Sequence, residues 1–248
     1  MPRGVGGREI TLLHLETHTA RLSRIPRDLL WEALRHRSDP YARYTFTRLE
    51  EALSRTRVKR RMGEKVRYSN LGFAALGYAL AQTGGQSYER LIAKRICEPL
   101  SLSSTWVEPP PNQAERSVQG HRKVGKPVPP WNLASSTPAG GLHSSVADML
   151  TYLRAHLDTQ PSVLPAALEE VQRPRADIKK NRLAIGLGWL ITTRKGRTLI
   201  WHGGATGGFS GFAGFNREAS VALVALANGR VVGPLSRLGI KALDDLCE

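Results

Sequence analysis

The chain has 248 residues, of which 41% are hydrophobic, so it is long enough for one large domain or two small ones with a sizeable core. It has no apolar run that could cross a membrane. Residues 1–7 lack the apolar segment of a signal peptide. Cys97 and Cys247 are too few for a disulfide framework and lack metal-ligand spacing.

The formal net charge of +15 favours anionic partners such as nucleic acid, wall polymers or lipid headgroups. The positive charge is spread along the sequence, with short basic clusters at 59–61 and 179–182. Because the sequence has no helix-turn-helix, RRM or zinc-finger pattern, specific nucleic-acid binding has little support. A solvated basic surface is the simpler interpretation.

Residues 8–26 predict a short helix that enters a loop at 17–19. His14 and His18 are four residues apart and would share one helix face, a spacing that can bind zinc. However, Glu16 does not stand next to the first histidine as in H-E-x-x-H, and no third ligand is nearby. We therefore expect structural histidines, and neither a metal nor a cofactor.

Two helices are expected next. Residues 47–50 have the form of a capping box, which predicts a short helix. Tyr68, Ser69 and Asn70 then precede an apolar stretch with helical spacing, which should be buried and should end at Gly84-Gly85. A Tyr-Ser-Asn sequence directly before a buried helix is a candidate site. The alternative is an ordinary helix cap by Ser69 or Asn70.

The middle of the chain predicts two more helices around a loop. Ser87 caps one helix, which Pro99 ends, and the proline-rich residues 108–138 predict a long surface loop. A glycine turn at 139–142 leads to a second helix with a capping box at 145–148. The apolar face predicted for this helix comprises Val146, Met149, Leu150, Leu153 and Leu157.

From Gly186 the pattern indicates strands, predicted at 186–193 and 197–202. A glycine-rich step at 202–208 leads into a β-hairpin with strands at 209–215 and 221–227. These glycines either let a ligand approach the backbone closely or form a turn that only saves space. Helices followed by an antiparallel meander and a last helix indicate an α+β architecture. The apolar face predicted for the last helix comprises Leu235, Leu238, Ala242 and Leu246.

Four segments fit one family pattern. They are Tyr68-Ser69-Asn70 with its apolar helix, Glu98-Pro99-Leu100, Gly140-Gly141-Leu142 before a helix, and His202-Gly203-Gly204 on a strand. Together they resemble the serine β-lactamase and penicillin-binding-protein superfamily, in particular class C β-lactamases and the related esterases and D-alanyl-D-alanine carboxypeptidases. The most specific matches are YSNLGFAALG, GQSYERLIAKRICEPL and HGGATGGFSGFAGFN.

The resemblance runs from about Glu9 to Leu246. It implies one β-lactamase/transpeptidase-like domain over 1–248, with an antiparallel sheet flanked by helices and a helical subdomain. The helical part would span about 9–172, and the sheet with its closing helix about 184–247.

The resemblance also implies the site residues. The family uses Ser-x-x-Lys, whose serine is acylated, Tyr-x-Asn, whose tyrosine serves in proton transfer, and Lys-Thr-Gly or His-x-Gly beside the substrate. Tyr68 and Asn70 match the second motif. His202 and Gly204 match the third, and the backbone N–H of Ala205 matches an oxyanion-hole donor. A tyrosine near a cation loses its proton more readily than at its reference pKa of about 10, and an asparagine can hold a substrate amide.

The first motif is absent from these 248 residues, because no serine has a lysine three residues on. At that spacing Ser54 is followed by Arg57 and Ser87 by Arg90. The resemblance therefore implies an N-terminally truncated member that is inactive as given, without the nucleophile helix, its lysine, the second oxyanion donor and the first strands. Either the gene starts upstream of Met1 or it is a decayed copy.

Two other serines are weaker candidates for a nucleophile. Ser210 lies in a sequence that misses G-x-S-x-G at its last position. Ser69 is the middle residue of the second motif, where the family does not use it as a nucleophile. Attack by either would need a base within hydrogen-bond reach.

A missing nucleophile helix should leave Leu71–Ala81 facing a gap or water, and a missing strand should leave about 220–227 as an open apolar edge. We therefore expect poor solubility or self-association.

The resemblance implies a small-molecule or peptide substrate, namely a β-lactam, a D-Ala peptide or an ester. Localisation would be cytoplasmic if Met1 is the true start, although relatives are often exported. The alternatives are a non-catalytic protein whose cleft binds a wall peptide or partner, and a basic nucleic-acid-associated protein.

Overall fold

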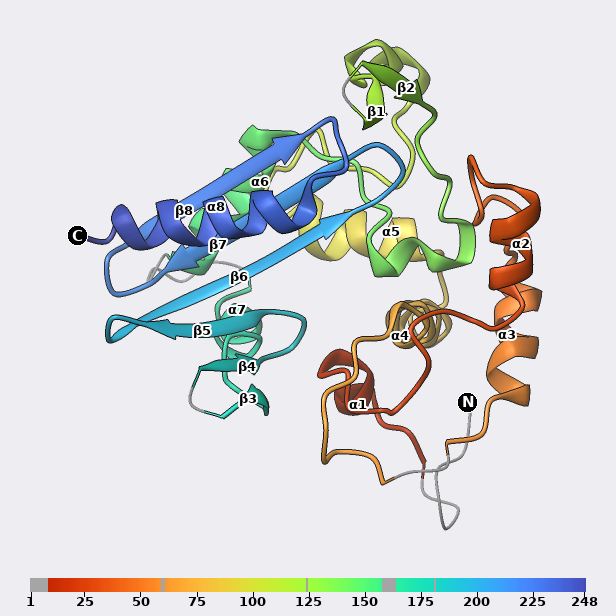
Figure 1. Cartoon of the computed structure of the whole chain (residues 1–248), viewed down its shortest axis with the longest axis horizontal. Coiled ribbons are helices and arrows are strands. Elements are labelled where there is room, and N and C mark those ends of the chain that lie inside the picture. The colour runs from red at the N-terminus through yellow and green to blue at the C-terminus, as the bar shows by residue number, and fades with distance from the viewer. Residues whose placement is uncertain (1–8, 59–60, 124, 158–163, 181) are drawn as a thin grey trace.

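In the computed structural model, an antiparallel sheet lies beside a helical body (Figure 1). This arrangement confirms the predicted α+β architecture. Residues 1–7 and parts of both predicted basic clusters lie outside the described residues. The structure describes residues 9–58, 61–123, 125–157, 164–180 and 182–248.

The main sheet is a six-stranded antiparallel meander in which each strand pairs with the next one in the chain. Its strands are β3 (Ala176–Lys179), β4 (Leu183–Ile185), β5 (Leu190–Arg194), β6 (Arg197–Ala205), β7 (Ser210–Asn216) and β8 (Val221–Ala227). Short turns are sufficient between antiparallel neighbours. The β7–β8 hairpin confirms the strands predicted in this part of the chain.

The beginning of the sheet differs from the prediction. The sequence predicts a strand over 186–193, but β5 begins only at Leu190. Gly188 has a φ of +82°, which bends the chain before the strand. β3 and β4 were not predicted, because β3 is mostly exposed and lacks the apolar alternation of a half-buried strand.

Two helices cover opposite faces of the sheet. In Figure 1, α8 (Val232–Asp245) crosses in front of β6, β7 and β8, and α6 (Val146–Leu157) lies behind β7 and β8. Apolar side chains fill the space between α6 and the sheet. The buried members of this core are Leu153, Trp189, Ile191, Ile200, Ala213 and Phe215.

α8 does not bury the face that its sequence predicts. Leu238 and Leu246 are 64% and 57% exposed, whereas Gly239 and Leu243 are buried. A Cβ on Gly239 would lie 2.4 Å from Phe212 of β7, so the helix can pack this closely only through a glycine. The predicted face is therefore wrong at Leu238 and Leu246, whereas Leu235 and Ala242 are half-buried.

α6 begins as predicted, but its cap and its apolar face differ. Ser145 Oγ accepts the N–H of Asp148 at 3.1 Å. The Asp148 carboxylate does not complete the capping box by accepting the N–H of Ser145. It accepts the Ser104 N–H and the Thr105 hydroxyl instead, each at 2.7 Å. Leu153 is buried, and Met149 and Leu157 pack against the same core, as predicted. Val146 and Leu150 of the predicted face are exposed.

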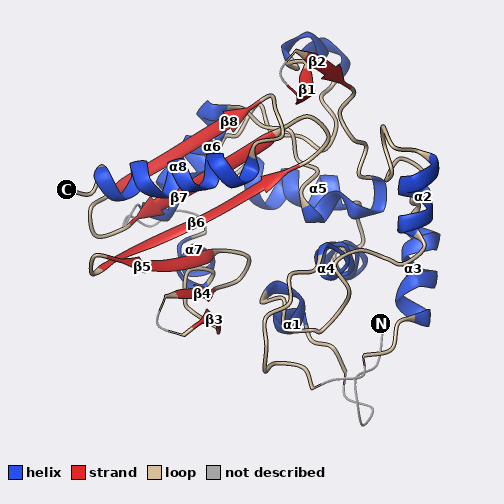
Figure 2. Cartoon of the chain, in the orientation of Figure 1, coloured by secondary structure: helices blue, strands red, loops and turns tan. Residues whose placement is uncertain are grey.

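The helical body contains a helix that the sequence did not indicate, α2 (Leu29–Arg35). The helix α3 (Phe46–Arg55) starts one residue before the predicted capping box, because Thr45 accepts the N–H of Arg48 and is the cap. The helices of this body are α1 (Leu12–Glu16), α2 (Leu29–Arg35), α3 (Phe46–Arg55), α4 (Asn70–Thr83) and α5 (Tyr88–Ile92), which continues as a π-helix (Ala93–Cys97). Figure 2 shows these helices on one side of the molecule and the six-stranded sheet on the other.

α4 lies in the core of the helical body, as predicted, and Gly84 is its C-cap. The expectation that Leu71–Ala81 faces a gap is wrong for its first half, because Leu71, Ala74 and Ala75 are at most 1% exposed. α1 and the 3₁₀ helix Ala134–Ala139 pack against α4. α4 and α8 are the longest helices described, with 14 residues each, and no described helix has both the length and the hydropathy to span a bilayer.

Residues 108–138 are more ordered than the long loop that the prolines predict. They contain a 3₁₀ helix (Pro111–Arg116) and the two-stranded hairpin of β1 (Gly120–Lys123) and β2 (Lys126–Val128). The backbone N–H of His121 donates to Gly208 O and to Asn228 O. This hairpin therefore rests on the loops that follow β6 and β8. In the chain, one further helix, α7 (Pro165–Glu170), follows α6 and precedes the first strand of the six-stranded sheet.

Candidate active site

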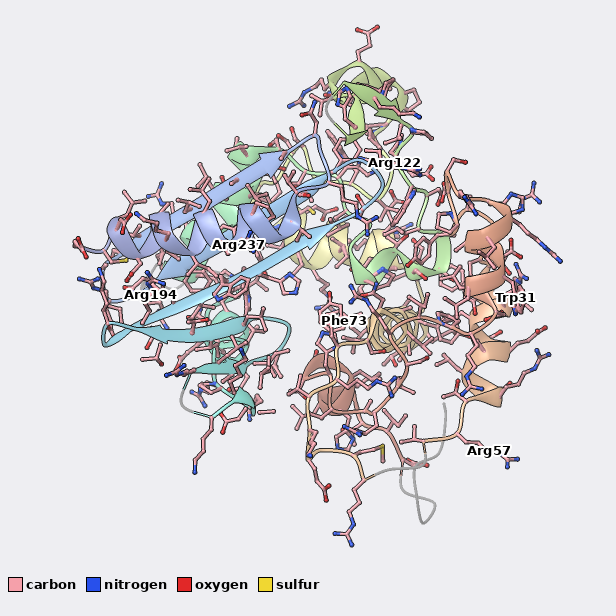
Figure 3. All side chains as sticks on the ribbon, viewed as in Figure 1. Trp31, Arg57, Phe73, Arg122, Arg194 and Arg237 are labelled. Carbon is pink, nitrogen blue, oxygen red and sulfur yellow. The ribbon has the colours of Figure 1, made fainter. Side chains whose placement is uncertain are left out.

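The second and third predicted motifs face each other where the helical body meets the sheet. Tyr68 directly precedes the Ser69 cap of α4, and His202 lies on β6. Their rings are 6.5 Å apart and nearly parallel, at 26°. Figure 3 shows Phe73 of α4 at this boundary. The fold thus brings together residues that are more than a hundred positions apart in the sequence.

The glycines in and after β6 differ in the space around them. A Cβ on Gly203 would lie 2.5 Å from Ser236 Oγ of α8, so His202 and Gly204 project from the opposite face of the strand. A Cβ on Gly204 would meet nothing within 4 Å, whereas one on Gly207 would lie 2.4 Å from the Trp131 ring. Gly203 and Gly207 therefore save space, and Gly204 borders open space that a ligand can enter.

The backbone at the end of β6 is also open on one side. β5 pairs with β6 only as far as Trp201, and β7 continues beside β6 to Ala205. Among the described residues, His202–Ala205 thus have a neighbouring strand on one edge only. A strand in this position leaves half of its backbone groups available to a ligand, as a donor at Ala205 requires.

His18 is a site residue that the sequence analysis assigned only a structural role. It is buried, and its Nδ1 accepts the backbone N–H of Ser69 at 3.1 Å. Its ring centroid lies 4.3 Å from that of Tyr68 and 4.8 Å from that of Phe73. Burial, and to a smaller extent the charge of His202, lower the pKa of His18 to about 4. His18 therefore positions the Tyr68 segment as a neutral imidazole.

The predicted shared helix face of His14 and His18 does not exist. α1 ends at Glu16, and His18 lies beyond it with a φ of +55°. His14 Nδ1 instead interacts with Thr11 in the cap of α1. In the part of the chain that the structure describes, no group of three or more His, Cys, Asp or Glu side chains is arranged to hold a metal ion.

The environment of Tyr68 favours the protonated phenol. Although 41% of Tyr68 is exposed, burial raises its pKa, and the opposing charge of Arg24 is too small to reverse the shift. The Arg24 guanidinium carbon lies 5.6 Å from the centroid of the Tyr68 ring. Burial also lowers the pKa of His202. The expectation of a tyrosine that loses its proton more readily than usual is therefore wrong for these residues.

Asn70 is held by its backbone and lies beside Tyr41. Its N–H donates to Arg24 O at 2.8 Å, and its side chain interacts with the hydroxyl of Tyr41. Burial raises the pKa of Tyr41, against the influence of Asn70 and the charges of Arg24 and Arg230. Two arginines from separate segments thus act on the tyrosine next to Asn70.

Neither alternative serine is free to act as a nucleophile. Ser69 Oγ donates to Ser23 O at 2.6 Å and accepts the N–H of Gly72 at 2.8 Å. Ser210 Oγ donates to Gly229 O and accepts the N–H of Val231, both at 2.8 Å. Both side chains are buried. Each hydroxyl therefore already donates one hydrogen bond and accepts another within the fold.

The sequence as a whole matches the family model described as Beta-lactamase over residues 2–246. The chain belongs to the β-lactamase family. It is 30% identical over 216 residues to the D-alanyl-D-alanine-carboxypeptidase/endopeptidase AmpH of Escherichia coli strain K12, across 82% of this chain and 54% of AmpH. It is also 30% identical over 128 residues to a Beta-lactamase of Pseudomonas fluorescens, across 49% of this chain and 34% of that protein.

Solved structures of β-lactamase-family proteins share the fold. The Beta-lactamase/D-alanine carboxypeptidase from Yersinia pestis superposes with a TM-score of 0.82 at 22% identity, over 100% of this chain and 73% of that one. The class C β-lactamase from Rhodobacter sphaeroides gives 0.79 at 22% identity, over 97% and 72%. These superpositions confirm the β-lactamase/transpeptidase fold. The chain spans about half the length of AmpH.

Proposed function

We propose that these 248 residues carry the substrate-binding part of a β-lactamase-type acyl-transfer site and do not catalyse turnover by themselves. The sequence has no serine with a lysine three residues on. The hydroxyls of Ser69 and Ser210 are committed to backbone partners. In full-length relatives, a serine oxygen would attack an amide or ester carbonyl, form an acyl-enzyme and release it to water.

The roles proposed for the site residues follow from their surroundings. Asn70 would hold a substrate amide, and the N–H of Ala205 would stabilise a carbonyl oxygen that becomes negative. His202 and Gly204 would form the strand edge beside the substrate. Tyr68, as a neutral phenol, can donate a proton but is a poor base at neutral pH. A lysine ammonium next to it would lower its pKa, and the motif that would supply that lysine is not in these residues.

A non-catalytic binding protein is the second candidate. The open space at Gly204 and the backbone hydrogen bond that holds Asn70 support a cleft that recognises a wall peptide or partner without turnover. Such a protein would bind its ligand and lose that binding in Asn70→Ala. Calorimetric titration with a D-Ala-D-Ala peptide measures this, and an unchanged affinity in the variant would exclude the role of Asn70. β-Lactams, D-Ala peptides and simple esters are the substrate classes to compare.

Self-association through the end of the sheet is also part of the proposal. Among the described strands, β8 is an end strand with only β7 beside it, and an apolar end strand tends to pair with another chain. We expect the isolated chain to be oligomeric in light scattering. A cooperative melt of a monomer would refute this.

Two further expectations are proposed for the chain. We expect one domain over 1–248, so limited proteolysis should leave no stable fragment of half the chain. If Met1 is the true start, we expect cytoplasmic localisation, which cell fractionation would test.

Covalent labelling tests the proposed function. The purified chain, shown to be folded by circular dichroism, is incubated with a fluorescent penicillin and with a fluorophosphonate. Its mass is then measured by intact-protein mass spectrometry. E. coli AmpH is the positive control. We expect no adduct on the chain. An adduct mapped to Ser69 or Ser210 would overturn the proposed lack of catalysis.

A further inference from the structure

Three exposed apolar side chains lie on α2, a helix at the edge of the helical body (Figure 1). Figure 3 labels one of them, Trp31. Leu29 is buried in the helical core, whereas Leu30, Trp31 and Leu34 are 54%, 67% and 59% exposed. At 3.6 residues per turn, these three side chains lie on the side of the helix away from Leu29. We call them the α2 patch. Single exposed leucines are ordinary, but three large apolar side chains on one helix face mark an interaction surface.

Positive charge predominates in the segment that carries the α2 patch. Residues 24–48 contain six arginines and three acidic residues, which leaves a net charge of +3 (6 − 3). Four of these arginines are exposed close to the patch in sequence and form no ion pair with another described residue. They are Arg27, Arg35, Arg37 and Arg43.

The acidic residues of the same segment already have partners. Asp28 accepts the hydroxyl of Tyr44 at 3.1 Å. Glu32 forms an ion pair with Arg48 at 2.7 Å. Asp39 accepts three backbone N–H groups at 2.8–3.2 Å. With all three carboxylates counted, the segment 24–48 keeps its net charge of +3, and its four exposed arginines are not paired with them.

We propose that the α2 patch docks the chain on a lipid bilayer that contains anionic headgroups. Tryptophan and leucine side chains partition into the boundary between headgroups and acyl chains, and flanking arginines pair with lipid phosphates. The bilayer supplies both an apolar phase for the patch and negative charge for the arginines. This inference does not depend on whether the chain is catalytic.

A second copy of the chain fits the α2 patch less well. In a two-fold dimer the same surface meets itself, so the arginines around one patch would face those around the other. Like charges set against each other across an interface oppose association. The charge complementarity therefore favours the bilayer over a dimer through α2.

Vesicle flotation tests the proposal and separates it from self-association. The chain is mixed at low salt with vesicles of phosphatidylcholine and phosphatidylglycerol and centrifuged under a sucrose gradient. Bound protein rises with the vesicles, and protein that only aggregates sinks. We expect flotation with the mixed vesicles and little with pure phosphatidylcholine. Equal flotation with both would overturn the role of charge.

The apolar contribution is tested by serine substitutions. Replacing Leu30, Trp31 and Leu34 by serine should lower the partition coefficient by at least about a hundredfold, since each large side chain withdrawn from water strengthens partitioning by about fivefold or more. The matched control is Leu238→Ser with Leu246→Ser, which removes exposed leucines from α8. The proposal fails if the α2 variant floats like the unmodified chain. It also fails if the α2 variant changes only the oligomeric state in light scattering.

The charge contribution is tested by two triple variants that remove the same net charge. Each arginine near an anionic bilayer strengthens binding about fivefold, so loss of three should weaken it about a hundredfold. The first variant is Arg27→Gln, Arg35→Gln and Arg43→Gln. The control variant is Arg57→Gln, Arg90→Gln and Arg237→Gln, all exposed away from α2 (Figure 3 labels Arg57 and Arg237). Equal losses in both would show a diffuse attraction of the whole chain and overturn the assignment to α2.

Discussion

Replacing Ser69 by alanine separates a structural serine from a reactive one. The Ser69 hydroxyl caps α4 by accepting the N–H of Gly72, and it donates to the carbonyl oxygen of Ser23. Loss of an N-cap costs about 0.5–2 kcal/mol, and a buried carbonyl without its donor costs about 1–3 kcal/mol. Because one oxygen makes both bonds, the two costs are not fully additive. We expect the free energy of unfolding to fall by about 2–4 kcal/mol.

Urea denaturation followed by circular dichroism measures this change. Ser54→Ala is the matched control, because the Ser54 hydroxyl is exposed and donates only to Glu51 O of its own helix; its effect should be within about 0.5 kcal/mol. A Ser69→Ala variant as stable as the unmodified chain would refute the cap argument. If the unmodified chain also labels with fluorophosphonate and this variant does not, Ser69 is a nucleophile.

Three further experiments test separate parts of the structure. Burial lowers the pKa of His156 to about 4, below the value of about 6.5 in an unfolded chain. As the pH falls the unfolded state binds a proton first, so the free energy of unfolding should fall by up to about 3 kcal/mol from pH 6.5 to 4. Denaturation of His156→Phe at several pH values should lack this part of the loss. Gly239→Val should cost about 1–3 kcal/mol through contact with the ring beneath α8, whereas Gly233→Ala, whose Cβ would have no neighbour closer than 3.7 Å, should be neutral in thermal melts. Gly204→Ala should fold normally yet weaken ligand binding, and Gly207→Ala should lower the melting temperature; the opposite pattern would contradict the assignment of Gly204 to the cleft.

The local sequence was sufficient for features that depend on neighbouring residues. Ser69 caps α4, and Gly84 ends it, because capping needs only the hydroxyl and the backbone a few residues away. Lys195 and Gly196 both have positive φ between β5 and β6, as a two-residue hairpin turn requires. The matches of Tyr68 and His202 to family motifs were visible for the same reason, since a motif is a local pattern.

The sequence by itself therefore determined the family, the main α+β elements, and the absence of Ser-x-x-Lys within these residues. Tertiary structure decided the position of His18 against Tyr68, the direction in which the pKa of Tyr68 shifts, and the side of α8 that is buried. These features depend on desolvation and on contacts between distant segments, which residue spacing does not encode. For α8, the close approach of Gly239 to the sheet outweighed the burial that its leucines would have gained.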